Sequence, residues 1–293
     1  MRAWVNTFGM IVAAWALASP ALATPATVPA PKRIVSINAC ADQLLLALAD
    51  PAQIAALSIY AADPAYSYLA DQARAFPHDA GAAETVIQRQ PDLVLAGRFT
   101  KRETRAMLKR LGFNVVELDT AKSIDDSIAQ IRDVAALLGH PERGEALIAR
   151  IEAARAKAAA AVPADAPKPT VAVYQRRGYV TGQNTLTGEL LRLAGFADMG
   201  GQLAGKTGGF VPLERIVSEH PDLLVVADPQ PVATDQGIAL MAHPALQALY
   251  PPERRIALST RLTNCAGPSL PEAIETLAGD RARIASGKTM SGS

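Results

Sequence analysis

The sequence has little of several features that mark common classes of protein. Aromatic residues make up only 5% of the 293 residues, and the formal net charge is +1. No long run of like charges occurs, so the chain offers no basic surface of the kind that binds nucleic acid. Hydrophobic residues nevertheless reach 49%, which suits a sizeable core in one large domain or two modest ones.

Motifs of catalysis are also missing. The sequence contains no G-x-S-x-G elbow and no G-x-G-x-x-G after a strand. The stretch from Gly200 to Thr207 formally matches the phosphate-binding pattern G-x₄-G-K-T. No predicted strand runs directly into this stretch and no helix follows it, so we attribute the match to chance. The sequence therefore does not predict an enzyme.

Metal-binding spacings are absent as well. The four histidines are His78, His140, His220 and His243, and no H-x-H or H-x₃-H pair occurs among them. Three of them precede a proline, which is typical of turns. We expect neither a metal site in the protein nor a cofactor.

The N-terminus has the pattern of an export signal. Arg2 precedes an apolar stretch over 8–17, and Ala21-Leu22-Ala23 forms an A-x-A cleavage signal. The apolar stretch is short for a membrane span, although a membrane anchor is the alternative. Since no cysteine lies near the cleavage point, we expect a soluble protein without a lipid anchor, mature from about Thr24.

Short apolar runs alternate with helical segments in the first part of the chain. This alternation predicts an α/β fold with a parallel sheet covered by helices. The expected strands are 33–37, 53–59, 93–96 and 114–118, and the expected helices are 42–49, 84–89 and 103–111.

A long helical region follows, and then the first pattern returns. Ser123 begins a helix that ends at Gly139, and Pro141 begins another that runs to about Val162. At 1.5 Å per residue the second helix would be a rod of roughly 33 Å. Strands are then expected at 170–174, 223–227 and 255–258, and helices at 187–194, 214–218 and 269–277. The predicted division is a signal peptide (1–23), an N-terminal lobe (24–140), a linking helix (141–165) and a C-terminal lobe (166–293).

One motif occurs in both predicted lobes. A glutamate, six further residues and Pro-Asp-Leu appear from Glu84 to Leu93 and again from Glu214 to Leu223. In each copy the glutamate lies near a helix start, where it stabilises the helix dipole, and the proline ends the helix. The helix dipole alone does not explain why the same spacing occurs twice. The spacing predicts two related α/β lobes.

Four segments together resemble a known family. They are Arg33-Ile-Val-Ser-Ile-Asn38 with Asp42-Gln-Leu-Leu45, the two Glu to Pro-Asp-Leu motifs, and the long helix in mid-chain. In order and spacing the chain resembles the type III periplasmic substrate-binding proteins of ABC importers, which serve ferric siderophores, haem and cobalamin. The family often has glutamate where Asp42 stands.

The resemblance implies a fold and partners. It implies two Rossmann-like lobes with central parallel sheets, joined by one long rigid α-helix. It further implies a monomer in the periplasm, whose Glu84 and Glu214 dock onto arginines of an ABC permease in the inner membrane. Charge complementarity at two separated points would fix the orientation of docking.

Ligands of open α/β sheets bind beyond the carboxyl ends of strands, so the two lobes should share a cleft. Arginine forks bind carboxylate, hydroxamate or catecholate oxygens, and tyrosines provide flat contact area. The alternative for any single arginine is a solvent-exposed or rim position. The candidate ligand residues are Asn38, Cys40, Tyr60, Arg98, Phe99, Tyr174, Arg176, Arg177, Tyr179, Phe210, Arg261 and Cys265, with Tyr66, Tyr68, Thr100 and Asn264 in the same loops.

The two cysteines, Cys40 and Cys265, follow predicted strands in different lobes. In an exported protein a pair of cysteines favours a disulfide, which here would tie the lobes together. Packed thiols and ligation of a metal or ligand are the alternatives.

These features favour a periplasmic protein that captures a metal chelate, a ferric siderophore ahead of cobalamin or haem, and delivers it to a permease. A periplasmic enzyme or thiol protein on the same bilobal frame is the alternative from another class.

Overall fold

The computed structural model describes residues 29–163, 165–226 and 240–286. The expected signal peptide and its cleavage point near Ala23 lie outside these residues. Within them, no helix combines the length and the apolar character needed to cross a membrane.

The N-terminal lobe (N-lobe) is built on a parallel sheet, as predicted. Its strand order is β3-β2-β1-β4-β5, and every adjacent pair is parallel. The strands are β1 (Ile34–Ser36), β2 (Ile54–Ser58), β3 (His78–Asp79), β4 (Leu93–Gly97) and β5 (Val115–Leu118). The helices are α1 (Ala39–Leu48), α2 (Ala70–Ala73), α3 (Ala83–Gln88) and α4 (Arg102–Arg110), with a 3-10 turn, η1 (Pro51–Gln53).

The C-terminal lobe (C-lobe) has a mixed sheet, which corrects the expectation of a parallel one. The strand order is β11-β10-β6-β7-β9, with β8 also paired to β6. The strands are β6 (Thr170–Gln175), β7 (Tyr179–Thr181), β8 (Ala197–Asp198), β9 (Gly208–Phe210), β10 (Leu223–Val226) and β11 (Arg255–Ala257). The helices are α7 (Leu186–Leu193), α8 (Gly200–Ala204), α9 (Leu213–Glu219), α11 (Pro244–Leu249), α12 (Thr260–Thr263) and α13 (Leu270–Ala285), with 3-10 turns η2 (Arg176–Gly178), η3 (Leu240–Ala242) and η4 (Pro252–Arg254).

A tight turn explains the antiparallel part of this sheet. At η2, Arg177 and Gly178 have positive φ angles of 62° and 75°. Left-handed backbone at this point reverses the chain at once, so β7 returns alongside β6 and pairs with it antiparallel. The chain has no room for a crossover helix between the two strands, and a parallel pairing would require one.

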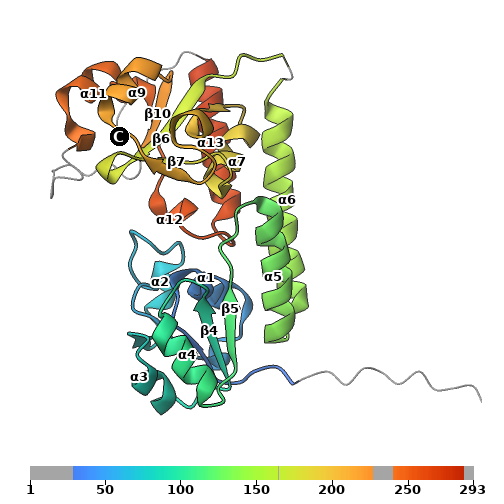
Figure 1. Ribbon diagram of the computed structural model, residues 1–293. Helices are drawn as coiled ribbons and strands as arrows, with labels where there is room; N and C mark the ends of the chain where they lie inside the picture. Colours follow the sequence, from blue (N-terminus) through green and yellow to red (C-terminus); the bar gives the residue numbers. More distant parts are fainter. Residues whose placement is uncertain (1–28, 164, 227–239, 287–293) are drawn as a thin grey trace, which may run out of the picture.

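Two helices connect the lobes. The hydroxyl of Ser123 caps α5 (Ile124–Leu138) by accepting from the Asp126 amide, and Gly139 ends it with a φ of 85°. Then α6 (Pro141–Ala161) runs along both lobes and packs on α5 and on α13 (Figure 1). Its buried face, including Leu147 and Ile151, belongs to one hydrophobic cluster that contains side chains of both lobes.

The aspartate of each Pro-Asp-Leu motif has a structural role that the sequence did not reveal. Asp92 accepts hydrogen bonds from the backbone amides of Lys32 and Arg33, 2.6 and 2.9 Å away, just before β1. Asp222 accepts from the amide and the hydroxyl of Thr170, the first residue of β6. Each aspartate therefore fixes the start of the first strand of its lobe.

The two copies also end their helices in the same way. The residues before the prolines, Gln90 and His220, have φ angles of 48° and 46°. Proline keeps the preceding residue out of the right-handed helical region, and here both residues take the left-handed conformation. The shared geometry explains why the spacing from glutamate to proline is the same in both lobes.

The stretch from Gly200 to Thr207 does not form a phosphate-binding loop. Its first five residues are α8, and Lys206 and Thr207 lie in the turn before β9. A phosphate-binding loop would instead wrap its backbone amides around an anion and lead into a helix.

Candidate functional site

A cavity of about 370 Å³ lies between the lobes, and we call it the polar chamber. From the N-lobe it is lined by side chains that follow β1, β4 and β5, and from the C-lobe by the start of α7 and the loop after α12. Its lining includes Asn38, Cys40, Gly97, Arg98, Phe99, Thr100, Asp119, Lys122, Gln130, Asn184, Thr185, Thr187, Thr207, Asn264 and Cys265.

A second cavity of about 420 Å³, the tyrosine chamber, adjoins the first. Tyr60, Tyr66 and Ile59 line it with exposed fractions of 52%, 49% and 52%. Large apolar or aromatic side chains are rarely left this exposed in a group, so the loop after β2 offers a prepared contact surface. The rest of the lining includes Asp79 and Lys101. It also includes three residues that line the polar chamber as well, namely Asn38, Thr100 and Asn264.

A groove of about 630 Å³ continues the polar chamber along the outside of the N-lobe, between β5 and α5. Arg98, Asp119 and Lys122 line both spaces. The polar chamber therefore opens to the surface on this side.

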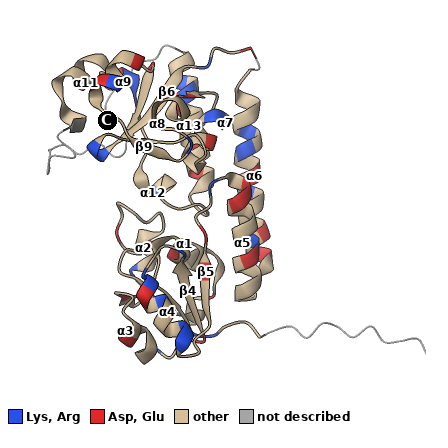
Figure 2. Ribbon diagram, in the orientation of Figure 1, with Lys and Arg blue, Asp and Glu red and all other residues tan. Residues whose placement is uncertain are grey.

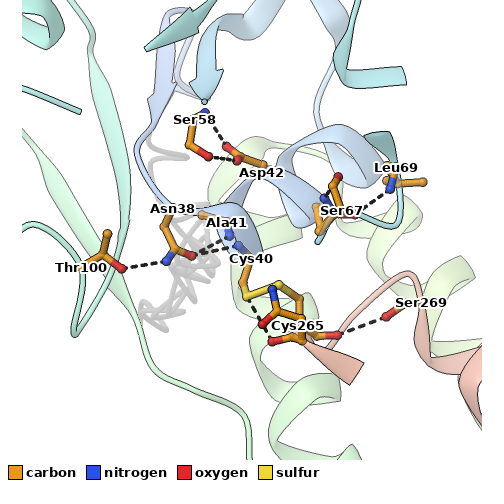
Figure 3. Close-up of a disulfide and its surroundings, with 12 residues drawn as sticks. Asn38, Cys40, Ala41, Asp42, Ser58, Ser67, Leu69, Thr100, Cys265 and Ser269 are labelled. Carbon is orange, nitrogen blue, oxygen red and sulfur yellow. Dashed lines mark hydrogen bonds between the residues drawn. A yellow bond between two sulfur atoms is a disulfide. The ribbon is translucent and has the colours of Figure 1, made fainter. Parts of the chain in front are cut away.

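A disulfide between Cys40 and Cys265 joins the lobes at the polar chamber, with the Cα atoms 5.1 Å apart (Figure 3). Cys40 lies in the first turn of α1, and Cys265 is buried in the loop after α12. The hydroxyl of Ser269 donates to the carbonyl of Cys265, which holds this loop in place. The structure thus pairs the cysteines and leaves no thiol to serve as a ligand.

Two helix N-termini face the polar chamber, one from each lobe. The side chain of Asn38 caps α1 by accepting from the amides of Cys40 and Ala41. The hydroxyl of Thr185 caps α7 by accepting from the amide of Gly188. Helix N-termini attract negative charge, so these two helices favour an anion in the space between them.

Arg98 and Lys122 add positive charge to the same chamber. The guanidinium of Arg98 contacts the carboxylate of Asp119 at 3.0 Å, and both side chains are about 60% exposed. Exposed ion pairs of this kind contribute little stability. Arg98 can therefore leave Asp119 and bind an anionic ligand with little loss of folding free energy.

Asp42 is hydrogen-bonded to Ser58 (Figure 3), and Ser58 lines the tyrosine chamber. Asp42 is fully buried, and its carboxylate accepts from the amide and hydroxyl of Ser58 at 3.1 and 2.5 Å. Burial raises the pKa of Asp42 to about 6, although hydrogen bonds from Ser36 and Ser58 oppose this shift. Because the Ser58 hydroxyl in turn accepts from the Tyr60 amide at 3.3 Å, Asp42 positions the start of the tyrosine loop.

Asp79 secures the other side of that chamber. Burial acts to raise the pKa of Asp79, but hydrogen bonds from Thr85, Arg89 and the Gly81 amide outweigh burial and lower it. The carboxylate is thus ionised, and both of its oxygens accept hydrogen bonds. Through Thr85 it connects the chamber wall to α3.

The structure corrects the placement of Tyr174. This side chain is fully buried in the C-lobe core together with Tyr250, and its hydroxyl makes no hydrogen bond to the described residues. The central strand β6 has helices on both faces, so a residue near its end still points into the core rather than into the cleft.

Four other candidates from the C-lobe lie outside the two chambers. Arg176 and Arg177 are exposed on the turn before β7. Tyr179 on β7 and Phe210 on β9 pack edge to face with their ring centres 5.6 Å apart, and Phe210 is 73% exposed. These residues form a rim on the C-lobe sheet edge.

Arg261 holds the lobes together instead of lining either chamber. Its guanidinium pairs with Glu272 on α13 at 3.1 Å and lies 5.7 Å from the centre of the Tyr68 ring in the N-lobe. The cation–π contact crosses from one lobe to the other.

Glu84 and Glu214 lie in the first turns of α3 and α9, and both side chains are exposed. These helices lie at the outer ends of the two lobes, away from the place where α1 of the N-lobe faces α12 of the C-lobe (Figure 1). Neither carboxylate forms an ion pair within the described part of the chain. Residues of both signs lie along α4 and α6 (Figure 2), in keeping with the balanced net charge.

Sequence reasoning missed several lining residues, namely Lys101, Asp119, Lys122, Asn184, Thr185, Thr187 and Thr207. Thr185 precedes an apolar helical run, which is an N-cap signature that could have placed the start of α7. Lys101, Asp119 and Lys122 follow strands that were predicted, but Lys101 lies further along its loop than the candidate residues there, and the loop after the expected strand 114–118 contributed no candidate. No group of three or more potential metal ligands occurs among the described residues.

Two α/β lobes, a helix that packs on both and a cavity lined by both lobes define a bilobal fold with a site between its lobes. Residues 34–251 match the family model described as periplasmic binding protein, and the chain belongs to this family. Members of the family are binding proteins rather than enzymes.

Individual relatives are distant. A cobalamin-binding protein of Halobacterium salinarum is 26% identical over 259 residues, which cover 85% of this chain and 69% of that protein. A periplasmic heme binding protein from Pseudomonas aeruginosa has a TM-score of 0.69 at 22% identity, covering 89% of this chain and 95% of the other. A structure from an ABC-type Fe³⁺-hydroxamate transport system of Saccharomonospora viridis has a TM-score of 0.65 at 22% identity. The match covers 86% of this chain and 93% of the other. The structural likenesses establish the bilobal fold.

Proposed function

We propose that this chain is the soluble periplasmic component of an ABC importer and that it carries a ferric siderophore. The observation that carries the proposal is the polar chamber, where two helix N-termini, Arg98 and Lys122 converge. This arrangement suits the oxygen-rich, negatively charged surface of a ferric chelate.

Cobalamin is the second candidate, with haem behind it. The 26% identical relative is a cobalamin-binding protein, and Tyr60 and Tyr66 offer flat rings to a macrocycle. The arginine and lysine are less suited to cobalamin, because it presents mostly amide groups rather than carboxylates or catecholates.

We further propose that the protein is exported, loses its signal peptide near Ala23 and works as a monomer. Glu84 and Glu214 then dock onto an inner-membrane permease. Their exposure and lack of an ion-pair partner within the described residues support this role, since a docking carboxylate should be free to pair with a permease arginine.

The test is ligand capture by the mature protein. Native mass spectrometry of protein purified from its own periplasm should show a co-purifying iron chelate. Calorimetric titrations should show binding of ferric chelates without turnover. If the protein binds cyanocobalamin or haemin but no ferric siderophore, that compound is its ligand instead. If the protein chemically converts the chelate, it is an enzyme or a thiol protein with the same bilobal fold.

A further inference from the structure

The two chambers share a wall. Asn38, Thr100 and Asn264 line both chambers, and no other residue does so among the described lining residues. The Asn38 amide nitrogen donates to the Thr100 hydroxyl at 2.9 Å, while its oxygen accepts from the Cys40 and Ala41 amides. Hydrogen bonds thus hold both ends of this side chain (Figure 3), and Asn38 has one orientation in the wall.

The disulfide fixes the wall across the lobes. Asn264 directly precedes Cys265, and its carbonyl oxygen lies 3.6 Å from the sulfur of Cys40. Since a bonded sulfur carries no hydrogen, this is a packing contact. Because the N-lobe part and the C-lobe part of the wall are covalently joined beside it, ligand entry cannot easily push them apart.

The chambers on either side differ in chemistry. The polar chamber has Arg98, Lys122, Asp119 and several hydroxyl and amide groups, beside the exposed ring of Phe99. The tyrosine chamber has half-exposed aromatic and aliphatic side chains and one lysine, Lys101, and the carboxylate of Asp79 in its wall is already hydrogen-bonded. Each chamber is near the lower limit of volumes that enclose a whole drug-sized ligand, so a larger chelate must extend beyond one chamber. From the polar chamber it can extend into the groove between β5 and α5 or into the tyrosine chamber, and the tyrosine chamber offers the two half-exposed rings of Tyr60 and Tyr66.

We propose that the divided cleft selects a bipartite chelate. Its anionic, oxygen-rich part occupies the polar chamber and an aromatic group occupies the tyrosine chamber, with the wall between them. This inference rests on the proposed function and narrows the substrate class to chelates that carry an aromatic ring.

Two ferric probes and one pair of substitutions test the inference. The ferric complex of 2,3-dihydroxybenzoate is aromatic, whereas ferric citrate is not. We expect Tyr60→Leu/Tyr66→Leu to weaken calorimetric binding of the aromatic complex about tenfold and to leave ferric citrate within about twofold. The matched variant Tyr60→Phe/Tyr66→Phe keeps both rings and should retain most of the affinity for the aromatic complex.

The outcomes separate this inference from the proposed function. Equal losses for both chelates, or no loss for either, would overturn the divided cleft while leaving chelate transport intact. If the wild-type protein binds neither chelate, the proposed function fails and the inference fails with it. Should the leucine pair not fold by circular dichroism, Tyr66→Leu alone, compared with Tyr66→Phe, gives the same contrast.

Discussion

Single polar residues, half-buried as Asn38 or fully buried as Asp42, set the geometry of the cleft. Asn38 uses both ends of its amide, and the carboxylate of Asp42 accepts two hydrogen bonds from Ser58. Buried polar groups are costly unless they are fully hydrogen-bonded, so each of these residues allows only one local arrangement of the chain. The shape of the chambers therefore depends on a few side chains that do not provide much contact area themselves.

Replacing Asp42 with asparagine should change how stability depends on pH. Burial raises the pKa of Asp42 from 3.8 to about 6 in the folded protein. The carboxyl group therefore contributes its full stabilisation of the folded protein below about pH 4. This stabilisation is lost as the pH rises through 6, which lowers the free energy of unfolding by about 3 kcal/mol. We expect the free energy of unfolding of Asp42→Asn, relative to wild type, to rise by that amount between about pH 4 and pH 7.5. Urea denaturation at several pH values measures the difference, and a difference that does not vary with pH would contradict the assignment.

Gly97→Ala should disturb the wall between the chambers. A Cβ atom at this position would lie 2.6 Å from the Asn38 amide nitrogen and 2.9 Å from the Thr100 hydroxyl oxygen. Because those two groups bond to each other, the added methyl group would separate them, and we expect a loss of about 1–3 kcal/mol. Thermal melting measures the loss, and calorimetry with a ferric chelate should show weaker binding.

Gly279→Ala is the matched control. It lies within α13, and a Cβ atom there would meet nothing within 4 Å. Alanine should stabilise this helix by about 0.5–1 kcal/mol. Equal effects of the two substitutions would show that Gly97 has no special role.

How well the sequence predicted the site depended on which strand a residue follows. Asn38 and Arg98 follow parallel strands whose carboxyl ends meet at one sheet edge, so they were placed in the cleft from the pattern alone. Tyr174 follows the same rule but lies on a strand buried on both faces, and periodicity cannot reveal which way such a residue points. Thr185 and Thr207 reach the chamber because η2 reverses the chain, and the short Arg177-Gly178 turn was not read as a hairpin.

At the scale of helices and strands, the repeated motif acts as a joint between helix and sheet. In each copy the aspartate fixes the first strand of the lobe, and the residue before proline ends the helix in the left-handed conformation. These contacts hold α3 and α9 rigidly on their lobes. The exposed glutamates in their first turns are therefore displayed in fixed positions.

Charge reversal at both glutamates tests the docking role. We expect Glu84→Lys/Glu214→Lys to reduce stimulation of the permease's ATPase activity by about tenfold or more in proteoliposomes, because two attractive contacts become repulsive. Ligand affinity should remain within about twofold, since neither glutamate lines either chamber. Glu275→Lys on α13 is the control for a change of surface charge. Full stimulation by the double variant would show that docking uses other residues.

At the scale of the whole molecule, two connections between the lobes stand out among the described residues, beside smaller contacts such as that of Arg261 with Tyr68. One is the packing of α6 on both α5 and α13, and the other is the disulfide, which closes a separation of 225 residues. A cross-link over so long a loop constrains the unfolded chain and stabilises the fold by about 5 kcal/mol in the chain-entropy account. We expect Cys40→Ser/Cys265→Ser to lose up to this amount in urea denaturation.

The same substitution should also release motion between the lobes. Two bodies that are attached at two points can rotate only about the line through both points, whereas one attachment allows bending in several directions. With the disulfide intact, small-angle scattering should therefore show almost the same radius of gyration with and without a ferric chelate. The Cys40→Ser/Cys265→Ser protein, in contrast, should be more expanded when free and should contract on binding. Wild-type protein treated with a dithiol reductant should behave like the variant, because reduction breaks the same bond without changing any side chain. Identical scattering of all three proteins would mean that α6 alone holds the lobes in place.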